Sequence, residues 1–241
     1  MLNKIDLQKL PEQAPEYDLS QLLEAGCHFG HLVRRGHPKM LEWIYMAKDG
    51  VHIFDLAKTA QQLQHAYNYA YQLGKEKKVL VLVGTKRQVK ETLKELGDKP
   101  GIMYITSRWL GGLLTNWEQV SKSLKRMLKI ESGLEGGTYD NHTKYERVQL
   151  EKEAGKLDRF FGGLRELKGI PDALFVIDPE REKIAIKEAN ALGVPVMALA
   201  DSNADPRTLD LVIPANDDAQ RSVNLIIGEI VKAYQAGQQA K

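Results

Sequence analysis

The stretch Arg108–Trp117, which reads RWLGGLLTNW, decides how the rest of the chain is organised. Two tryptophans flank the pair Gly111-Gly112, which permits a tight turn or a close approach of two backbone segments. An apolar series with spacings of 4, 3, 4 and 3 residues starts within the stretch, at Leu113, Trp117, Val120, Leu124 and Met127. This spacing predicts a helix that packs along one narrow stripe.

A second apolar series has the same spacing and lies further along the chain, at Leu150, Ala154, Leu157, Phe161 and Leu164. Glycines and polar residues fill positions 133–143 between the two series, where a loop is expected. Two stripes joined by a loop predict an antiparallel helical hairpin with coiled-coil packing over residues 107–167. The outer faces of this hairpin carry lysines and arginines, at Lys122, Lys125, Arg126, Lys129, Lys144, Arg147, Lys152, Lys156 and Arg159.

Strands and helices alternate in the sequence outside the hairpin. Residues 79–83 and 173–177 are continuous apolar runs, typical of strands that are buried on both faces of a parallel sheet. Shorter strands are expected at 102–106, 194–200 and 211–213, and helices at 88–96, 184–192 and 217–234. This order predicts a three-layer α/β domain with right-handed crossovers, into which the hairpin is inserted.

The segment before the first buried strand has its own expected elements. Residues 1–19 are predicted to be a flexible arm, and Ser20 is expected to cap a short helix over 20–25. Residues 26–40 predict an ordered loop, and 43–46 and 51–54 predict two strands around the turn signal Lys48-Asp49-Gly50. Asp55 is expected to cap a helix that reaches Gly74. The predicted units are therefore the arm, a globular domain of residues 20–106 and 168–235, the hairpin, and a tail of residues 236–241.

The composition indicates a folded protein with a full core. The 241 residues are 43% hydrophobic and 27% charged, and Cys27 is the only cysteine, so no internal disulfide can form. A lone cysteine suits a reducing cytosol. Residues 1–19 lack the apolar core of a signal peptide, and no apolar run approaches the roughly 20 residues of a membrane helix, so no membrane partner is expected.

The charge is unevenly distributed along the chain, although the net charge is only +2. Residues 75–130 hold 13 Lys and Arg against 5 Asp and Glu, whereas residues 131–241 hold 14 against 19. A basic block on a folded scaffold favours binding to a phosphate backbone. A solvated, lysine-rich helix face is the alternative interpretation of the same block.

The candidate motifs for catalysis and cofactor binding do not have the residue spacing that these functions require. Gly84-Thr85-Lys86 follows the first buried strand but lacks the other glycine of a phosphate loop. Asp201-Ser202-Asn203-Ala204-Asp205 begins like a calcium loop, but Pro206 stands where that loop needs glycine. Cys27, His28, His31 and His37 match no closed zinc pattern, and no nucleophile motif is present. The sequence therefore predicts no enzyme, no cofactor and no metal.

The remaining candidate site is a basic surface that also carries tryptophan side chains. The predicted RNA-binding residues share a basic side chain and lie on the early loop, after the first buried strand, before the Gly-Gly turn and on the hairpin: Arg34, Arg35, His37, Lys39, Lys86, Arg87, Arg108, Lys122, Lys125 and Arg126. Trp109 and Trp117 could stack on exposed bases. The favoured alternative is that both tryptophans anchor the hairpin to the domain.

Four blocks of the sequence together resemble one known family. They are LLEAGCHFGHLVRRGHPKM at 22–40, RWLGGLLTNW at 108–117, GIPDALFVIDP at 169–179 and ADSNADPRTLDLVIPANDDAQRSVNLI at 200–226. Over residues 22–227 the chain resembles the second protein of the small ribosomal subunit, bacterial type. Cys27 and the pair Gly36-His37 depart from the family pattern, which more often has a small aliphatic residue and Trp-Asn at these places.

The resemblance implies a flavodoxin-like α/β domain with a protruding coiled-coil hairpin. It also implies a non-enzymatic structural constituent of the small ribosomal subunit, which binds the small-subunit ribosomal RNA through the domain and the hairpin and supports translation. The expected place is a cytoplasmic ribosome, with an organellar ribosome as the alternative. Neighbouring small-subunit proteins are expected partners, and the first small-subunit protein, which captures messenger RNA, is a candidate among them.

Two rival functions belong to other classes. The first is a flavodoxin-like enzyme or sensor for a small phosphorylated ligand, and the missing glycine-rich phosphate loop argues against it. The second is an interaction protein that docks another protein through the hairpin.

Overall fold

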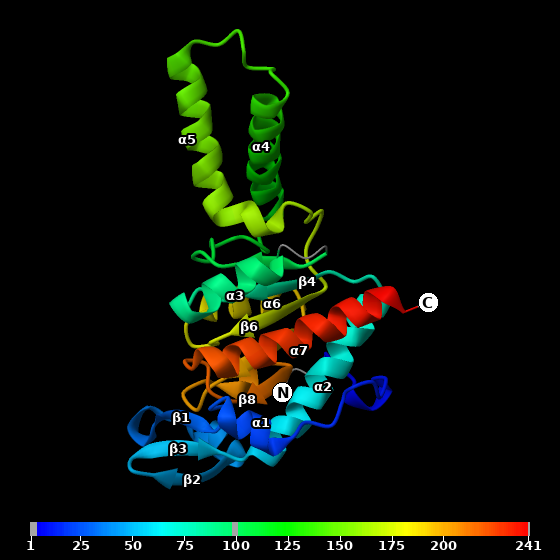
Figure 1. Ribbon diagram of the computed structural model, residues 1–241, viewed down its shortest axis with the longest axis vertical. Helices are drawn as coiled ribbons and strands as arrows, with labels where there is room; N and C mark the ends of the chain where they lie inside the picture. The colour runs from blue at the N-terminus through cyan, green and yellow to red at the C-terminus, as the bar shows by residue number, and fades with distance from the viewer. Residues whose placement is uncertain (1–3, 98–100, 241) are drawn as a thin grey trace.

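The computed structural model describes residues 4–97 and 101–240 (Figure 1). Its centre is a parallel sheet of β4 (Leu80–Val83), β5 (Met103–Ile105), β6 (Ala173–Ile177), β7 (Val196–Ala200) and β8 (Leu211–Pro214). The strands lie in the order β5-β4-β6-β7-β8, which is the order 2-1-3-4-5 of flavodoxin-like sheets. The prediction of a mainly parallel α/β sheet is confirmed.

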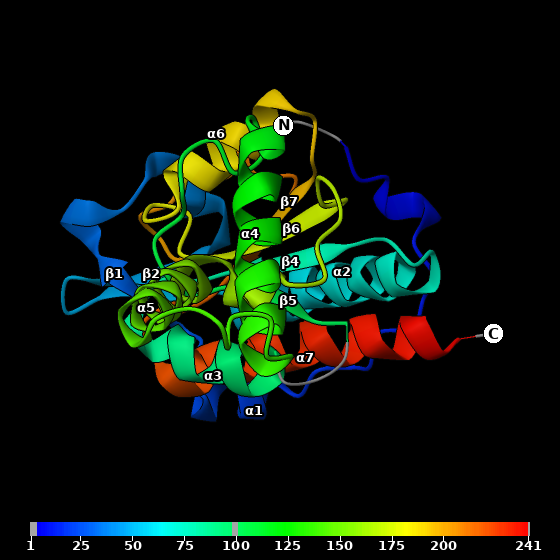
Figure 2. The same cartoon turned by 90° about the horizontal axis from the view of Figure 1, so that it is seen from above.

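Two apolar cores cover the two faces of this sheet, because successive side chains of a strand point to opposite sides. Leu80, Leu82 and Phe175 face the core under α2 (Leu56–Lys75), α3 (Arg87–Gly97) and α7 (Gln220–Gln239). Val81 and Leu174 face the other core, under α6 (Lys183–Ala191) and the base of the hairpin. The domain therefore has three layers, and α2 and α7 lie side by side on one of them (Figure 2).

The hairpin consists of α4 (Trp117–Glu135) and α5 (Lys144–Phe161), which stand away from the sheet in Figure 1. Leu124, Met127, Ala154 and Phe161 of the two predicted apolar series are buried. Leu113 precedes α4, and Leu164 lies in the 3-10 helix η4 (Gly162–Leu164) after α5, so each series extends beyond its helix. A reciprocal capping box between Thr143 and Glu146 fixes the start of α5.

A small antiparallel sheet precedes the α/β domain and has the order β1-β3-β2. Its strands are β1 (Phe29–Leu32), β2 (Ile44–Lys48) and β3 (Val51–Phe54). Asp49 and Gly50 both have positive φ, 52° and 76°, as the predicted two-residue hairpin turn requires. The prediction that residues 26–40 form a loop is wrong, because β1 and the 3-10 helices η2 (Val33–Arg35) and η3 (Pro38–Trp43) occupy this segment.

The structure corrects two predicted helix starts. Asp18 rather than Ser20 caps α1 (Leu19–Glu24), because its carboxylate accepts a hydrogen bond from the Ser20 backbone N–H at 2.8 Å. The closing helix α7 begins at Gln220 rather than at Asp217, because the Asn216 side chain accepts hydrogen bonds from the backbone N–H groups of residues 218 and 219. This turn leaves Asp217 outside the helix.

Residues 4–18 lie against the globular domain in the structure. They contain the 3-10 helix η1 (Leu7–Lys9) and the buried Ile5, and the Lys4 ammonium lies 3.5 Å from the Asp210 carboxylate. The flexibility of the arm stays a prediction. A fifth 3-10 helix, η5 (Pro206–Thr208), precedes β8. Within residues 4–97 and 101–240, no helix combines the length and the apolar character that a membrane span requires.

Candidate functional site

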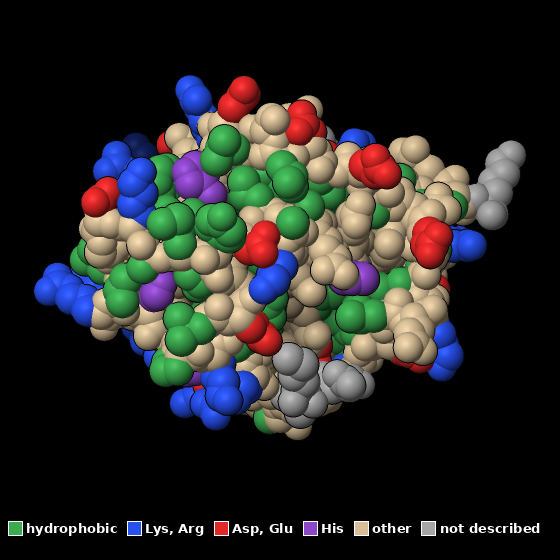
Figure 3. Space-filling view, turned by 90° about the horizontal axis from the view of Figure 1, so that it is seen from below, with side chains coloured by type: hydrophobic (Ala, Val, Ile, Leu, Met, Phe, Trp, Pro, Cys, Tyr) green, Lys and Arg blue, Asp and Glu red, His purple; other side chains and the backbone are tan. Residues whose placement is uncertain are grey.

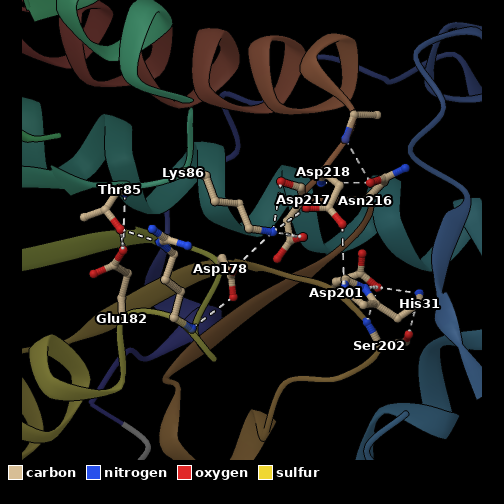
Figure 4. A network of polar contacts seen from close by, with 12 residues as sticks. His31, Thr85, Lys86, Asp178, Glu182, Asp201, Ser202, Asn216, Asp217 and Asp218 are labelled. Carbon is tan, nitrogen blue, oxygen red and sulfur yellow. Dashed lines mark hydrogen bonds and ion pairs between the residues drawn. The ribbon is translucent and has the colours of Figure 1, made fainter. Parts of the chain in front are cut away.

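Four acidic residues and Lys86 meet at the carboxyl ends of β4, β6, β7 and β8 (Figure 4). The Lys86 ammonium lies 2.9 Å from Asp178, 2.6 Å from Asp217 and 2.7 Å from Asp218. Burial lowers the pKa of Lys86, but the carboxylates, with Asp217 foremost, outweigh it and hold the pKa above its ordinary value. The side chain of Lys86 is only 12% exposed, and these carboxylates neutralise its charge within the domain.

His31 joins β1 to the same cluster. Its Nδ1 lies 3.0 Å from Asp201 Oδ1, and its backbone N–H donates hydrogen bonds to Asp201 Oδ1 and to Ser202 Oγ, both at 2.9 Å. The hydrogen bond to Asp201 is the largest cause of a raised His31 pKa. His31 therefore ties the small antiparallel sheet to the carboxyl edge of the large one.

The surroundings of Asp217 disfavour its charged form. It is fully buried, and its Oδ2 has no hydrogen-bond partner among the described residues. Burial, and next the carboxylates of Asp178 and Asp201, raise the pKa of Asp217 to about 7. One ligand atom from each of His31, Asp201 and Asp217 lies within 4.8 Å of the others, an arrangement that could hold a first-row divalent metal ion.

The sequence alone does not show this cluster, because its members come from β1 and from the ends of four other strands, β4, β6, β7 and β8. The zinc pattern weighed for Cys27, His28, His31 and His37 contributes only His31 to it. Cys27 is buried, and burial raises the pKa of its thiol. No pattern in the sequence indicates the contact of Asp201 with His31 or the contact of Asp217 with Lys86.

The raised pKa of Asp217 predicts a pH-dependent stability. The folded state binds this proton more tightly than the unfolded chain does, so the stabilisation is complete below the ordinary pKa of 3.8 and is lost as the pH rises through about 7. Between about pH 5 and about pH 8, we expect the wild-type chain to lose roughly 1 kcal/mol or more of unfolding free energy relative to Asp217→Asn. Urea unfolding at both pH values measures this, with the exposed Asp140→Asn as control. Parallel pH profiles for the wild type and Asp217→Asn would contradict the prediction.

A second polar network closes the end of β4. Arg181 Nε donates a hydrogen bond to Thr85 Oγ1 at 2.7 Å, and the Thr85 hydroxyl donates to the buried Glu182 carboxylate. Burial raises the pKa of Glu182 above its ordinary value. Thr85 therefore makes its hydrogen bonds inside the protein.

Glu188 of α6 organises the Trp-Gly-Gly turn. Its buried carboxylate accepts hydrogen bonds from Trp109 Nε1 at 3.1 Å and from the backbone N–H groups of Gly112 at 2.7 Å, Leu114 at 3.0 Å and Thr115 at 3.2 Å. Gly112 has a φ of +89°, which favours glycine. The Trp109 side chain is only 4% exposed, which confirms the anchoring role expected for it. No local pattern in the sequence points to Glu188.

Of the predicted residues of the early loop, Arg34 and Arg35 lie in η2 and Lys39 lies in η3, whereas His37 caps the start of η3. Arg34, Arg35 and Lys39 are exposed. His37 is half-buried: its Nδ1 accepts a hydrogen bond from the Lys39 backbone N–H at 3.2 Å, and its Nε2 lies 3.9 Å from Asp205. Gly36, before it, lies against the His52 ring, where an added Cβ would come within 2.4 Å of His52 Nε2.

The remaining predicted residues lie after β4, at the start of α3, before the Trp-Gly-Gly turn, and on α4, one of the two hairpin helices that stand away from the sheet in Figure 1. Arg87 at the start of α3, Arg108 before the Trp-Gly-Gly turn, and Lys125 on α4 are exposed. Lys122 and Arg126 are also exposed, but each has an acidic partner, Glu118 at 2.9 Å and Glu153 at 2.9 Å. The ten predicted residues therefore form separate groups rather than one patch.

The small antiparallel sheet and the adjoining η3 carry exposed apolar side chains. Figure 3 shows the lower end of the molecule, where hydrophobic side chains gather on the face and lysine and arginine lie mostly around its edge. Phe29 is 50% exposed, Leu41 is 56% exposed and Tyr45 is 73% exposed. These apolar side chains lie together on one face and are not scattered singly over the surface.

Residues 22–237 match the family model described as Ribosomal protein S2. The match covers most of the chain and includes both halves of the α/β domain and the hairpin between them. Proteins of this family are typically structural rather than enzymatic, and they associate with ribosomal RNA and with other small-subunit proteins. The chain therefore belongs to the ribosomal protein S2 family, whose members are structural constituents of the small ribosomal subunit and take part in translation.

Proposed function

We propose that this chain binds small-subunit ribosomal RNA through basic residues in two places, the early loop and the region from α3 to the hairpin. The observation that carries the proposal is that six of the predicted cations are exposed and have no ion pair among the described residues: Arg34, Arg35, Lys39, Arg87, Arg108 and Lys125. A charge that is free of internal partners can neutralise a phosphate without first breaking an ion pair.

The proposed contacts are mainly with the RNA backbone. The grooves of an A-form helix favour contacts with phosphates and 2′-hydroxyls over base recognition. Arginine forks suit phosphate oxygens because they offer parallel N–H donors. The exposed ion pairs of Lys122 and Arg126 cost little to break, so both remain candidates. His37 and Lys86 are proposed to support the RNA-binding surface without contacting phosphates themselves, because each is held by acidic side chains of the domain.

We also propose a division of the chain into units. Residues 107–167 form one protruding unit with coiled-coil packing, inserted between the two parts of the globular domain, 20–106 and 168–235. Residues 1–19 form an arm, and residues 236–241 form a tail. Neighbouring small-subunit proteins, with the messenger-RNA-capturing first protein as a candidate, are proposed to dock on the ribosome-bound chain, in the cytoplasm or in an organelle.

Filter binding of the whole chain to folded small-subunit RNA across a range of KCl concentrations tests this function. Arg35→Gln and Lys125→Gln are each expected to weaken binding and to reduce the slope of log affinity against log salt by about one unit. Lys75→Gln, at the exposed end of α2, is the matched control. An unchanged slope would remove that residue from the interface, and a wild-type chain that fails to bind the RNA would overturn the proposed function.

A further inference from the structure

A cavity of about 510 Å³ lies between the globular domain and the base of the hairpin. Its walls come from the end of β4 and the start of α3, from the residues before the Trp-Gly-Gly turn, from the last turn of α5, and from the residues before α6. In Figure 1 the lower end of the hairpin stands over α3 at this place. The volume is within the roughly 300–1,000 Å³ range of small-ligand sites.

The walls of the cavity are strongly basic. Lys90, Arg108, Arg159 and Arg181 line it, and Glu182 is the one acid among the lining residues that the structure describes. Glu182 already accepts the hydrogen bonds of Thr85. Like charges around one cavity repel each other, so an anion that enters it relieves this repulsion.

The four cations keep donors free for such an anion. Lys90, Arg108 and Arg159 are exposed, and none of them has an ion pair within the described ranges. Arg181 uses its Nε for Thr85 and leaves its other guanidinium nitrogens available. The adjoining cavity, which Lys94 and Arg165 line, differs because Arg165 is paired with Asp158 and Glu131.

An aromatic ring completes the wall. Phe160 is half-buried against the core, and the Arg159 guanidinium lies 6.0 Å from the centre of its ring. A flat ring beside arginine is the arrangement on which unpaired bases stack in single-strand binding sites. Because Arg159 and Phe160 belong to α5 while Lys90 belongs to α3, the cavity exists only where the hairpin packs against the domain.

We propose that this cavity binds one unpaired nucleotide of the small-subunit RNA, with its phosphate groups on Lys90, Arg108, Arg159 and Arg181 and its base against Phe160. The inference rests on the proposed function. It adds to that function a location, a single-stranded element of the RNA, and three further cations: Lys90 of α3, Arg159 of the hairpin base and Arg181 before α6. The exposed Arg87, at the start of α3, extends the basic surface from this region, so the RNA strand can continue outside the cavity.

Lysine footprinting of the whole chain tests the location. An amine-acetylating reagent is applied with and without folded small-subunit RNA, and the modification of Lys90 and Lys75 is read by mass spectrometry. We expect the RNA to protect Lys90 about fivefold and to leave Lys75 unchanged, because a bound phosphate covers the ammonium. RNA that binds with full affinity while Lys90 remains reactive would overturn the inference and leave the proposed function standing.

A matched pair of variants tests the energetic part. Arg159→Gln lines the cavity, whereas Lys156→Gln removes a charge from an exposed position of the same helix outside it. Arg159→Gln is expected to weaken RNA binding about tenfold, and Lys156→Gln less than about threefold. Equal effects of the two variants would overturn the inference. Lys90→Gln serves as the second variant if Arg159→Gln fails to fold.

A free nucleotide shares the chemistry of the proposed ligand, so a third arm separates the two sources. Adenosine monophosphate is added at millimolar concentration to the chain without RNA. No protection of Lys90 by the free nucleotide, together with protection by RNA, supports the inference. Protection by the free nucleotide and none by RNA would overturn it in favour of a small-molecule site. Failure of the wild-type chain to bind RNA would overturn the proposed function as well.

Discussion

Glu188→Ala is expected to lower the free energy of unfolding by about 4 kcal/mol, because it leaves buried donors without an acceptor. Trp109 Nε1 and the Leu114 backbone N–H are buried, and a buried donor without a partner costs roughly 1–3 kcal/mol. The N–H groups of Gly112 and Thr115 lose the same acceptor but lie closer to solvent. The turn that joins the hairpin to the domain should therefore loosen first.

Urea unfolding, followed by circular dichroism, measures this effect, and the exposed Glu166→Ala is the matched control. Glu166→Ala is expected to change the unfolding free energy by less than about 0.5 kcal/mol. An effect of Glu188→Ala as small as that of Glu166→Ala would show that the carboxylate does not organise the turn.

The pH dependence of the Glu188 effect provides a second check. Burial raises the pKa of Glu188, but the hydrogen bonds from Gly112, Trp109, Leu114 and Thr115 outweigh it and lower the pKa below 4.5. The folded state therefore binds this proton less tightly than the unfolded chain does. The stabilisation is present above about pH 4.5 and is lost as the pH falls through the lower folded pKa, so the difference between wild type and Glu188→Ala should shrink in acid.

Gly74→Ala is expected to destabilise the fold by about 3 kcal/mol, although alanine is the better helix former. Gly74 of α2 lies beneath the α7 backbone, and an added Cβ would come within 2.1 Å of the Tyr234 carbonyl oxygen. Gly237 of α7 makes the reciprocal contact, where an added Cβ would come within 2.0 Å of the Tyr71 carbonyl oxygen. The two helices can pack this closely only because both positions lack a side chain.

Gly228→Ala, also on α7, is the control for helix propensity. A Cβ at Gly228 would meet no atom within 4 Å, so this variant is expected to gain up to about 1 kcal/mol. Thermal and urea unfolding of the two variants should therefore shift in opposite directions. Stabilisation by Gly74→Ala would contradict the close packing of α2 against α7.

The sequence by itself determined the layered α/β fold and the hairpin. Runs such as 79–83 and 173–177 are apolar at every position, which only a strand covered on both faces can satisfy. The two apolar series of the hairpin lie on α4 and α5 and at their ends, because a spacing of 4 and 3 keeps side chains on one stripe. Local signals also gave the Asp49-Gly50 turn and the Asp55 cap of α2. These features depend on neighbours within a few residues, so their pattern is visible in the chain.

Only the tertiary structure decided which residues meet. Lys86, Asp178 and Asp217 come from three strand ends, and their ion pairs depend on the strand order rather than on local pattern. For the same reason, the sequence does not show the contact of Glu188 with the Trp-Gly-Gly turn or the need for glycine at positions 74 and 237. The tertiary structure also decides which basic charges stay available for a ligand. Lys86 is neutralised inside the domain, whereas Arg87 and Arg108 keep exposed charges near a cavity formed by elements distant in sequence. Coulombic and packing energies depend on distances in space, and a sequence fixes those distances only for residues close along the chain.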